Sequence, residues 1–246
     1  MNRFFAKTEN ISEDGIILDG SDVNHIKNVL RMKVGEKLMV AGGNNSNYIC
    51  AIREFAEDEV MLTILETCDN DNELKAEVYL FQGLPKSDKM ELIIQKCVEL
   101  GVHEIIPVNM KRCVVKLDDK KTDAKIKRWN SISESAAKQS GRGIIPRVSA
   151  PVSFDEAIKL CEEMDVKLIP YELAEGMQAT TEALSKIAPG MKIGFFIGPE
   201  GGFELSEIKK AKENGIIPIS LGKRILRTET AGLTVMSILM YHLETI

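Results

Sequence analysis

The stretch KIGFFIGPEGGFELSEIKKAKENG, residues 192–215, decides the fold of the larger part of this chain. Residues 192–197 predict a buried β-strand, because apolar side chains follow one another without the alternation of a half-buried strand. Residues 203–214 predict a helix that ends at Gly215. A buried strand joined to a helix by a short turn is the repeating unit of a parallel sheet covered by helices.

The same alternation extends on both sides of this stretch. Further strands are expected at 78–82, 102–108, 166–170 and 216–220. Further helices are expected from Asp88 to Gly101, at 122–140, from Ser153, at 181–188 and at 228–243. Ser153 and Glu156 have the spacing of a capping box at a helix start. The sequence therefore predicts an α/β domain with a largely parallel sheet over residues 71–246.

The first 70 residues have a different pattern of short strands and turns. Strands are expected at 15–18, 37–41, 48–55 and 60–65, and one helix at 22–31. This pattern predicts a small β-barrel with one helix. The polar segment 68–73 is expected to be the linker between the two domains, 1–70 and 71–246.

Composition narrows the class of protein. The chain has 246 residues, 44% of them hydrophobic and 28% charged, which is typical of a folded globular protein. No apolar run approaches the roughly 20 residues of a membrane helix, and the first ten residues lack the apolar core of a signal peptide. We therefore expect a cytoplasmic protein. Five scattered cysteines and three isolated histidines predict neither disulfides nor a metal site.

Charge is unevenly distributed along the chain. The formal net charge is −5, yet residues 111–147 contain 11 basic and 4 acidic residues, a local net charge of +7. Such a stretch can bind a polyanion, and it can equally be the solvated face of a helix.

Two loops stand out as candidates for ligand binding. Ile197-Gly198-Pro199-Glu200-Gly201-Gly202 lets the backbone approach a ligand closely, but it matches neither common nucleotide-phosphate motif and can also be a plain tight turn. Residues 221–231 place apolar side chains where a loop is usually polar, which is typical of a site for a flat ligand. Arg227 precedes the helix that begins at 228, where a cation opposes the helix dipole, so helix capping by Thr228 or Thr230 does not explain it.

Five ordered segments resemble the RsmE-type 16S rRNA (uracil-N3) methyltransferases of the SPOUT superfamily. They are NRFF (2–5) with HIKNVLR (25–31), KME (89–91) with QKCVELG (95–101), Trp129 with ESAAKQSGR (134–142), IGPEGGFELSEI (197–208) and LGKRILRTETAGL (221–233). The likeness covers nearly the whole chain. It implies a PUA-like N-terminal β-barrel that binds RNA and a C-terminal parallel sheet with a trefoil knot.

The resemblance also implies a cofactor, a partner and site residues. It implies S-adenosylmethionine as the cofactor, 16S rRNA in the small ribosomal subunit as the substrate, and a homodimer with the final helix at the interface. The implied cofactor-binding residues are Tyr171, Glu172, Ile197, Gly198, Glu200, Gly201, Gly202, Leu221, Gly222, Ile225 and Leu226.

Chemistry suggests roles for two further residues. N3 of uracil is a poor nucleophile until its proton leaves, so a cation that stabilises charge on the uracil oxygens helps most, and Arg227 is our candidate. Glu229 or Glu200 could accept the proton, although Glu229 could instead only pair with Arg227. Candidates for holding the RNA are Arg3, Arg31, Lys86, Lys89, Arg112, Lys138 and Arg142.

Three other functions compete with this interpretation. Another SPOUT-type enzyme would methylate ribose 2′-oxygens, and an assembly factor would bind rRNA without catalysis. The glycines and Arg227 argue against the assembly factor. A nucleotide-dependent oxidoreductase is disfavoured, because the chain lacks the G-x-G-x-x-G fingerprint and an acidic residue after a second strand.

Overall fold

The computed structural model describes residues 1–43, 46–69, 71–115, 119–174 and 176–245, with only the backbone at 119–121. It divides the chain into two compact units. The first unit contains residues 1–73 and 137–145, and the second contains residues 74–136 and 146–246. Residues 137–145, which the sequence analysis assigned to the C-terminal domain, therefore pack with the N-terminal unit.

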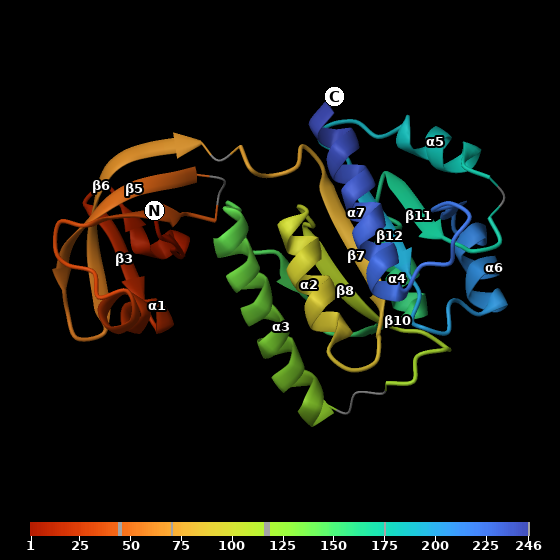
Figure 1. Cartoon of the computed structure of the whole chain (residues 1–246), viewed down its shortest axis with the longest axis horizontal. Helices are drawn as coiled ribbons and strands as arrows, with labels where there is room; N and C mark the ends of the chain where they lie inside the picture. The colour runs from red at the N-terminus through yellow and green to blue at the C-terminus, as the bar shows by residue number, and fades with distance from the viewer. Residues whose placement is uncertain (44–45, 70, 116–118, 175, 246) are drawn as a thin grey trace. The chain divides into compact units, whose positions relative to one another are not determined.

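The first unit is a curved six-stranded sheet (Figure 1). Its elements are β1 (Arg3–Phe5), η1 (Thr8–Asn10), β2 (Ile11–Ser12), β3 (Gly15–Asp19), α1 (Ser21–Asn24), η2 (His25–Val29), β4 (Lys37–Ala41), β5 (Ser46–Phe55) and β6 (Glu59–Asp69). The strand order is β1-β4-β5-β6-β3-β2, with β1 parallel to β4 and all other pairs antiparallel. Alternate residues of β3, β4 and β6 point into one apolar core together with Val23 and Ile26.

Two expectations for this unit were wrong in part. The helix expected at 22–31 is an α-helix only to Asn24 and continues as the π-helix η2, in which the Leu30 N–H donates to the His25 carbonyl at 2.8 Å. The expected linker begins too early, because β6 extends to Asp69 through its pairing with β5. Polar residues in 66–69 gave no strand signal, since pairing with a neighbouring strand, not side-chain pattern, holds them extended.

The second unit is a parallel sheet with helices on both faces (Figure 1). Its strands are β7 (Glu77–Gly83), β8 (Glu104–Asn109), β9 (Arg147–Val148), β10 (Val152–Ser153), β11 (Val166–Pro170), β12 (Lys192–Ile197) and β13 (Ile217–Ile219). Its helices are α2 (Lys89–Glu99), α3 (Asp119–Ser140, whose last residues belong to the first unit), α4 (Phe154–Cys161), α5 (Gln178–Leu184), α6 (Leu205–Glu213) and α7 (Thr228–Thr245). The strand order is β10-β8-β7-β12-β11-β13, with β9 beside β8.

The central strand β12 is buried on both faces from Ile193 to Ile197, as its unbroken apolar run predicted, and the neighbouring β7 is buried from Leu80 to Gly83. Phe81 and Phe196 stack with ring centroids 4.6 Å apart and pack against α4 and α6. On the opposite face, α2 and α7 pack against each other and α7 contacts β12. The capping box at Ser153 is confirmed, with Glu156 accepting from the Ser153 N–H at 2.8 Å. Asp88, in contrast, makes no side-chain cap at the start of α2.

No helix in the described part of the chain combines the length and apolar character needed to cross a membrane.

Candidate active site

A cavity of about 440 Å³ opens at the carboxyl ends of β11, β12 and β13. In an open parallel sheet, this is the edge at which loops gather to bind ligands. All eleven residues expected to bind a cofactor line it: Tyr171, Glu172, Ile197, Gly198, Glu200, Gly201, Gly202, Leu221, Gly222, Ile225 and Leu226. Three loops that are distant in the sequence therefore form one site.

The glycine-rich loop needs its glycines for close packing. A Cβ on Gly83, at the end of β7, would lie 2.8 Å from the Pro199 nitrogen, so the two strand ends meet with no room for a side chain. A Cβ on Gly201 would lie 3.1 Å from the Arg112 Cβ, and Gly202 has φ +67°. Close packing against Gly83 and Arg112, together with the left-handed turn at Gly202, therefore fixes the conformation of the loop.

Thr228 and Gln82 join the loop to the helix that follows it. The Thr228 hydroxyl donates to the Gly198 carbonyl at 2.6 Å and accepts from the Gln82 amide at 3.0 Å. Gln82 is fully buried at the end of β7. The carboxyl end of β7, the loop after β12 and the start of α7 are therefore one hydrogen-bonded assembly.

Lys89 connects both candidate proton acceptors. Its ammonium lies 3.0 Å from Glu200 and 3.5 Å from Glu229. Burial opposes ionisation of Glu200, but the Lys86 N–H, the loop backbone and the Lys89 ammonium outweigh it and lower the pKa of that carboxyl. Hydrogen bonding to Glu200 in turn raises the pKa of Lys89. The alternative in which Glu229 pairs with Arg227 is not what the structure shows, because Glu229 faces Lys89.

Arg227 lines the cavity at the start of α7. Its carbonyl accepts from the Ala231 N–H at 2.8 Å, so the residue precedes the first turn of the helix. Its guanidinium is exposed and has no hydrogen-bond or ion-pair partner among the described residues. A cation held at a helix N-terminus without a carboxylate partner opposes the helix dipole, so it is not explained by stability. Its five donors are available to an anionic or carbonyl-bearing ligand.

Apolar residues of the second loop are exposed at the cavity. Ile225 has 84% of its surface exposed, which is unusual for isoleucine, and Leu221 and Leu226 beside it are half-buried. Gly222, with φ +105°, turns the chain between them. The cavity thus combines apolar walls with backbone polar groups, a combination that suits a flat heterocycle carrying polar substituents. Its volume lies within the range of about 300–1,000 Å³ seen for small-molecule and cofactor sites.

Comparison with known proteins shows the family. Residues 72–240 match the RNA methyltransferase domain model, and residues 18–65 match the RNA methyltransferase PUA domain model. The chain is 36% identical over 230 residues to ribosomal RNA small subunit methyltransferase E of Bacillus subtilis, covering 92% of this chain and 90% of that protein. The chain belongs to the family of ribosomal RNA small subunit methyltransferase E.

Solved structures of relatives agree. A crystal structure of ribosomal RNA small subunit methyltransferase E from Neisseria gonorrhoeae bound to S-adenosyl methionine has a TM-score of 0.84 at 32% identity, covering 98% of this chain and 97% of the other. A Legionella pneumophila protein solved in complex with the bound cofactor SAM gives a TM-score of 0.84 at 32% identity, covering 97% of this chain and 96% of the other. The α/β fold with an N-terminal PUA-like sheet is thereby confirmed.

Some of the residues expected to hold RNA are exposed, and the others contact residues of the protein itself. Lys86 and Arg31 are exposed. Arg142 was assigned wrongly, because its side chain is buried and its Nε donates to Glu73 at 2.8 Å. The Lys138 ammonium also contacts the protein itself, because it lies 2.8 Å from the Asp22 carboxylate and 5.8 Å from the Phe4 ring centroid.

Three further residues of this set, Arg3, Arg112 and Lys89, also contact other residues of the protein. Arg3 donates to Asn47 at 3.1 Å and to the Arg142 carbonyl at 2.7 Å. Arg112 bonds Glu204 at 3.0 Å and the Gly201 carbonyl at 2.9 Å, so it supports the glycine-rich loop. Lys89, described above, belongs to the cavity. Charge alone could not separate these roles.

Sequence reasoning missed several cavity residues. They are Lys89 in this role, Pro170, Pro199, Phe203, Ser220, Arg224 and Ala231, together with Thr228 and the supporting Gln82. Gln82 did give a signal, because an amide that ends an otherwise apolar strand needs a buried partner. The others flank predicted residues and could be found only from the folded loops.

Proposed function

We propose that this chain transfers the methyl group of S-adenosylmethionine to N3 of a uridine in the RNA of the small ribosomal subunit. The observation that carries the proposal is the cavity at the ends of β11, β12 and β13, with Arg227, which has no partner among the described residues, on its wall. The names of the relatives support the choice of small-subunit rRNA.

The cofactor fits the residues present. Exposed Ile225 with Leu221 and Leu226 would enclose the adenine, while backbone groups of the glycine-rich loop would hold the polar end. The cofactor supplies an activated methyl group, so the protein mainly positions the acceptor. We propose the same eleven lining residues as the binding set and a knotted arrangement of their loops.

The chain's own residues would prepare the nucleophile. Arg227 would donate to a uracil carbonyl oxygen and stabilise the charge that develops as the N3 proton leaves. Glu229 or Glu200 would accept that proton directly or through water. The Lys89 ammonium, 3.0 Å from Glu200 and 3.5 Å from Glu229, would orient both carboxylates. Exposed Lys86 and Arg31 would contact phosphates.

We propose further that the protein is a cytoplasmic homodimer associated through α7. Tyr241 of α7 is 71% exposed and Leu92 of the neighbouring α2 is 43% exposed, which leaves apolar surface on this face. Light scattering after size-exclusion chromatography measures the mass directly, and a monomer at micromolar concentration would contradict this part.

The decisive experiment has two steps. Calorimetric titration of S-adenosylmethionine should give saturable heat, and NADH should give none. Small subunits lacking the modification should then be methylated with labelled cofactor and digested to nucleosides. A product with 3-methyluridine supports the proposal, a 2′-O-methyl nucleoside moves the function to ribose methylation, and cofactor binding without any product contradicts catalysis.

A further inference from the structure

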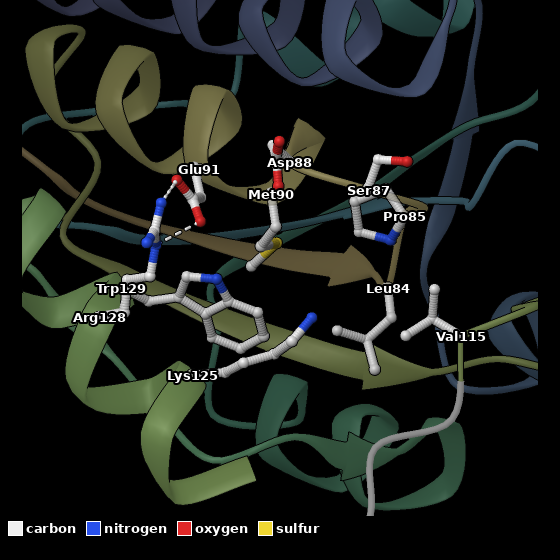
Figure 2. A pocket seen from close by; sticks show the side chains of 10 residues that line it. All are labelled: Leu84, Pro85, Ser87, Asp88, Met90, Glu91, Val115, Lys125, Arg128 and Trp129. Carbon is white, nitrogen blue, oxygen red and sulfur yellow. Dashed lines mark hydrogen bonds and ion pairs between the residues drawn. The ribbon is translucent and has the colours of Figure 1, made fainter. Parts of the chain in front are cut away.

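The second unit contains another cavity, of about 280 Å³ (Figure 2). It is lined by Leu84, Pro85, Ser87, Asp88, Met90, Glu91, Val115, Lys125, Arg128 and Trp129. These residues come from the segment between β7 and α2, from α2 itself and from α3, with Val115 from the segment between β8 and α3. None of them belongs to the proposed cofactor site, so the cavity has no assigned role.

The two cavities share a wall. The segment 84–91 lines the second cavity, while the Lys86 N–H donates to Glu200 at 3.0 Å and the Lys89 ammonium contacts Glu200 and Glu229. Ser87 and Asp88 lie between these two lysines in sequence and face the second cavity. A ligand in the second cavity is therefore separated from the methyl-transfer site by one turn of chain.

The most deeply buried residues of the second cavity are apolar. Leu84, Met90 and Trp129 are each no more than 3% exposed and form its deep side. Figure 2 shows the Trp129 ring beside Lys125, whose ammonium points into the space between the ring and Leu84. The ammonium is 5.9 Å from the ring centroid. The apolar side chains around this space favour the planar face of a base, and the ammonium among them can donate to a polar atom on its edge.

The rim supplies hydrogen-bond acceptors in fixed positions. Arg128 donates to both oxygens of Glu91, at 2.6 and 2.8 Å, which fixes the carboxylate plane and leaves each oxygen a free lone pair. The Asp88 carboxylate makes no cap and has no side-chain hydrogen bond among the described residues. Ser87 holds φ +55°, a strained conformation for serine that presents this segment to the cavity.

We infer that the second cavity is a subsite for an RNA base next to the target uridine, and that it takes a base with an exocyclic amine. Carboxylates at the rim accept from the amino groups of cytosine, adenine or guanine, while the Lys125 ammonium donates to a ring nitrogen or carbonyl of the same base. Uracil has no amino group and is disfavoured here, so the subsite distinguishes the neighbouring base from the target. This inference rests on the proposed RNA methylation.

Trp129 provides the test, because it is the chain's only tryptophan and lines this cavity. CMP, AMP, GMP and UMP are titrated into the full-length protein without cofactor, and tryptophan fluorescence is recorded. At least one of the first three nucleotides should give saturable quenching, with UMP binding about tenfold more weakly or worse. Equal quenching by all four, quenching by inorganic phosphate alone, or no saturable change up to millimolar nucleotide would overturn the inference.

Matched variants locate the binding. Asp88→Ala and Lys125→Gln should each weaken the binding of the preferred nucleotide about tenfold. Asp123→Ala and Lys127→Gln change exposed residues of α3 outside the cavity and should leave it unchanged. Thermal melts confirm that each variant is folded. Unaltered binding in both cavity variants, or equal losses in the controls, would contradict the subsite.

The proposed function is measured separately on the same samples. If wild-type protein binds no S-adenosylmethionine, the proposed function fails, whatever the fluorescence shows. If it binds and transfers methyl groups, Asp88→Ala should raise the KM for small subunits without changing cofactor affinity. An unchanged KM with normal methyl transfer would count against the subsite alone.

Discussion

The end of α3 and the start of α7 each present an arginine that sequence reasoning selected for function. At the end of α3, Arg142 is 2% exposed and its guanidinium is held by Glu73, which also accepts from the Gly143 N–H at 2.8 Å. At the start of α7, Arg227 is exposed and unpartnered among the described residues. Arg142 stabilises the fold, whereas Arg227 is available to a ligand. Burial and partners, rather than charge, separate the two roles.

The largest expected effect comes from breaking the buried pair. Arg142→Ala leaves the Glu73 carboxylate without its main partner and should lower the free energy of unfolding by about 3–5 kcal/mol. Arg147→Ala removes an exposed arginine five residues further along the chain and should change stability by no more than about 0.5 kcal/mol. Urea denaturation measures both. Equal free energies of unfolding for the two variants would contradict the structural role of Arg142, and with it the contrast between Arg142 and Arg227.

Removal of the Arg227 side chain should lower activity without lowering stability. Arg227→Ala should lower kcat about 10²- to 10³-fold, as expected for loss of a donor to a developing oxyanion. Cofactor affinity and melting temperature should stay near the wild-type values. Arg224→Ala is the matched control, because Arg224 also lines the cavity and is exposed. Unchanged turnover in Arg227→Ala, or an equal loss in both variants, would end the catalytic role.

A smaller effect should follow from filling the space between two strand ends. A methyl group at Gly83 would meet Pro199, so Gly83→Ala should destabilise the protein by about 1–3 kcal/mol and weaken cofactor binding. Gly232→Ala, where the nearest atom is at ordinary contact distance, should be neutral or stabilising. Calorimetry and thermal melts give both quantities. A Gly83→Ala variant with normal affinity would show that the loop tolerates displacement.

The smallest expected effect is a shift in acid sensitivity. The pKa of Glu200 is lowered in the folded protein, so its contribution to stability is full above the ordinary pKa of 4.5 and is lost as pH falls through the lowered value. Lys89→Met removes the cation and should move this loss to higher pH. Lys96→Met, whose ammonium pairs with Glu99, should not. Melting temperature measured across acidic pH tests this, and parallel curves for the two variants would contradict it.

Much of the site followed from sequence because its loops carry strong local constraints. The apolar run at 192–197 predicted β12, and the next five residues predicted a close-packed turn. The apolar loop before Arg227 was equally distinctive. All eleven lining residues then met in one cavity, since parallel strands bring the loops at their carboxyl ends to one edge.

The roles of individual charges were not predictable in the same way. Lys89 and Arg112 have the same charge as Lys86, yet the first two are held by carboxylates or carbonyls of the glycine-rich loop. Their partners lie about 90 to 110 residues away in the chain, and no local sequence pattern indicates a contact between residues so far apart. The π-helix at His25–Val29 escaped prediction for a similar reason, because its periodicity differs little from that of an α-helix over one turn.

Sequence by itself determined the α/β class, the two-part organisation and the family, because periodicity, glycine placement and motif order are local properties. Only the tertiary structure decided that Glu229 faces Lys89, that Arg142 is buried on Glu73 and that Arg227 has no partner within the described part of the chain. It also brought Met90, Glu91 and Trp129, which belong to two separate sequence motifs, together in the second cavity. Ion pairs and cavities depend on distances between remote segments, and these distances exist only after folding.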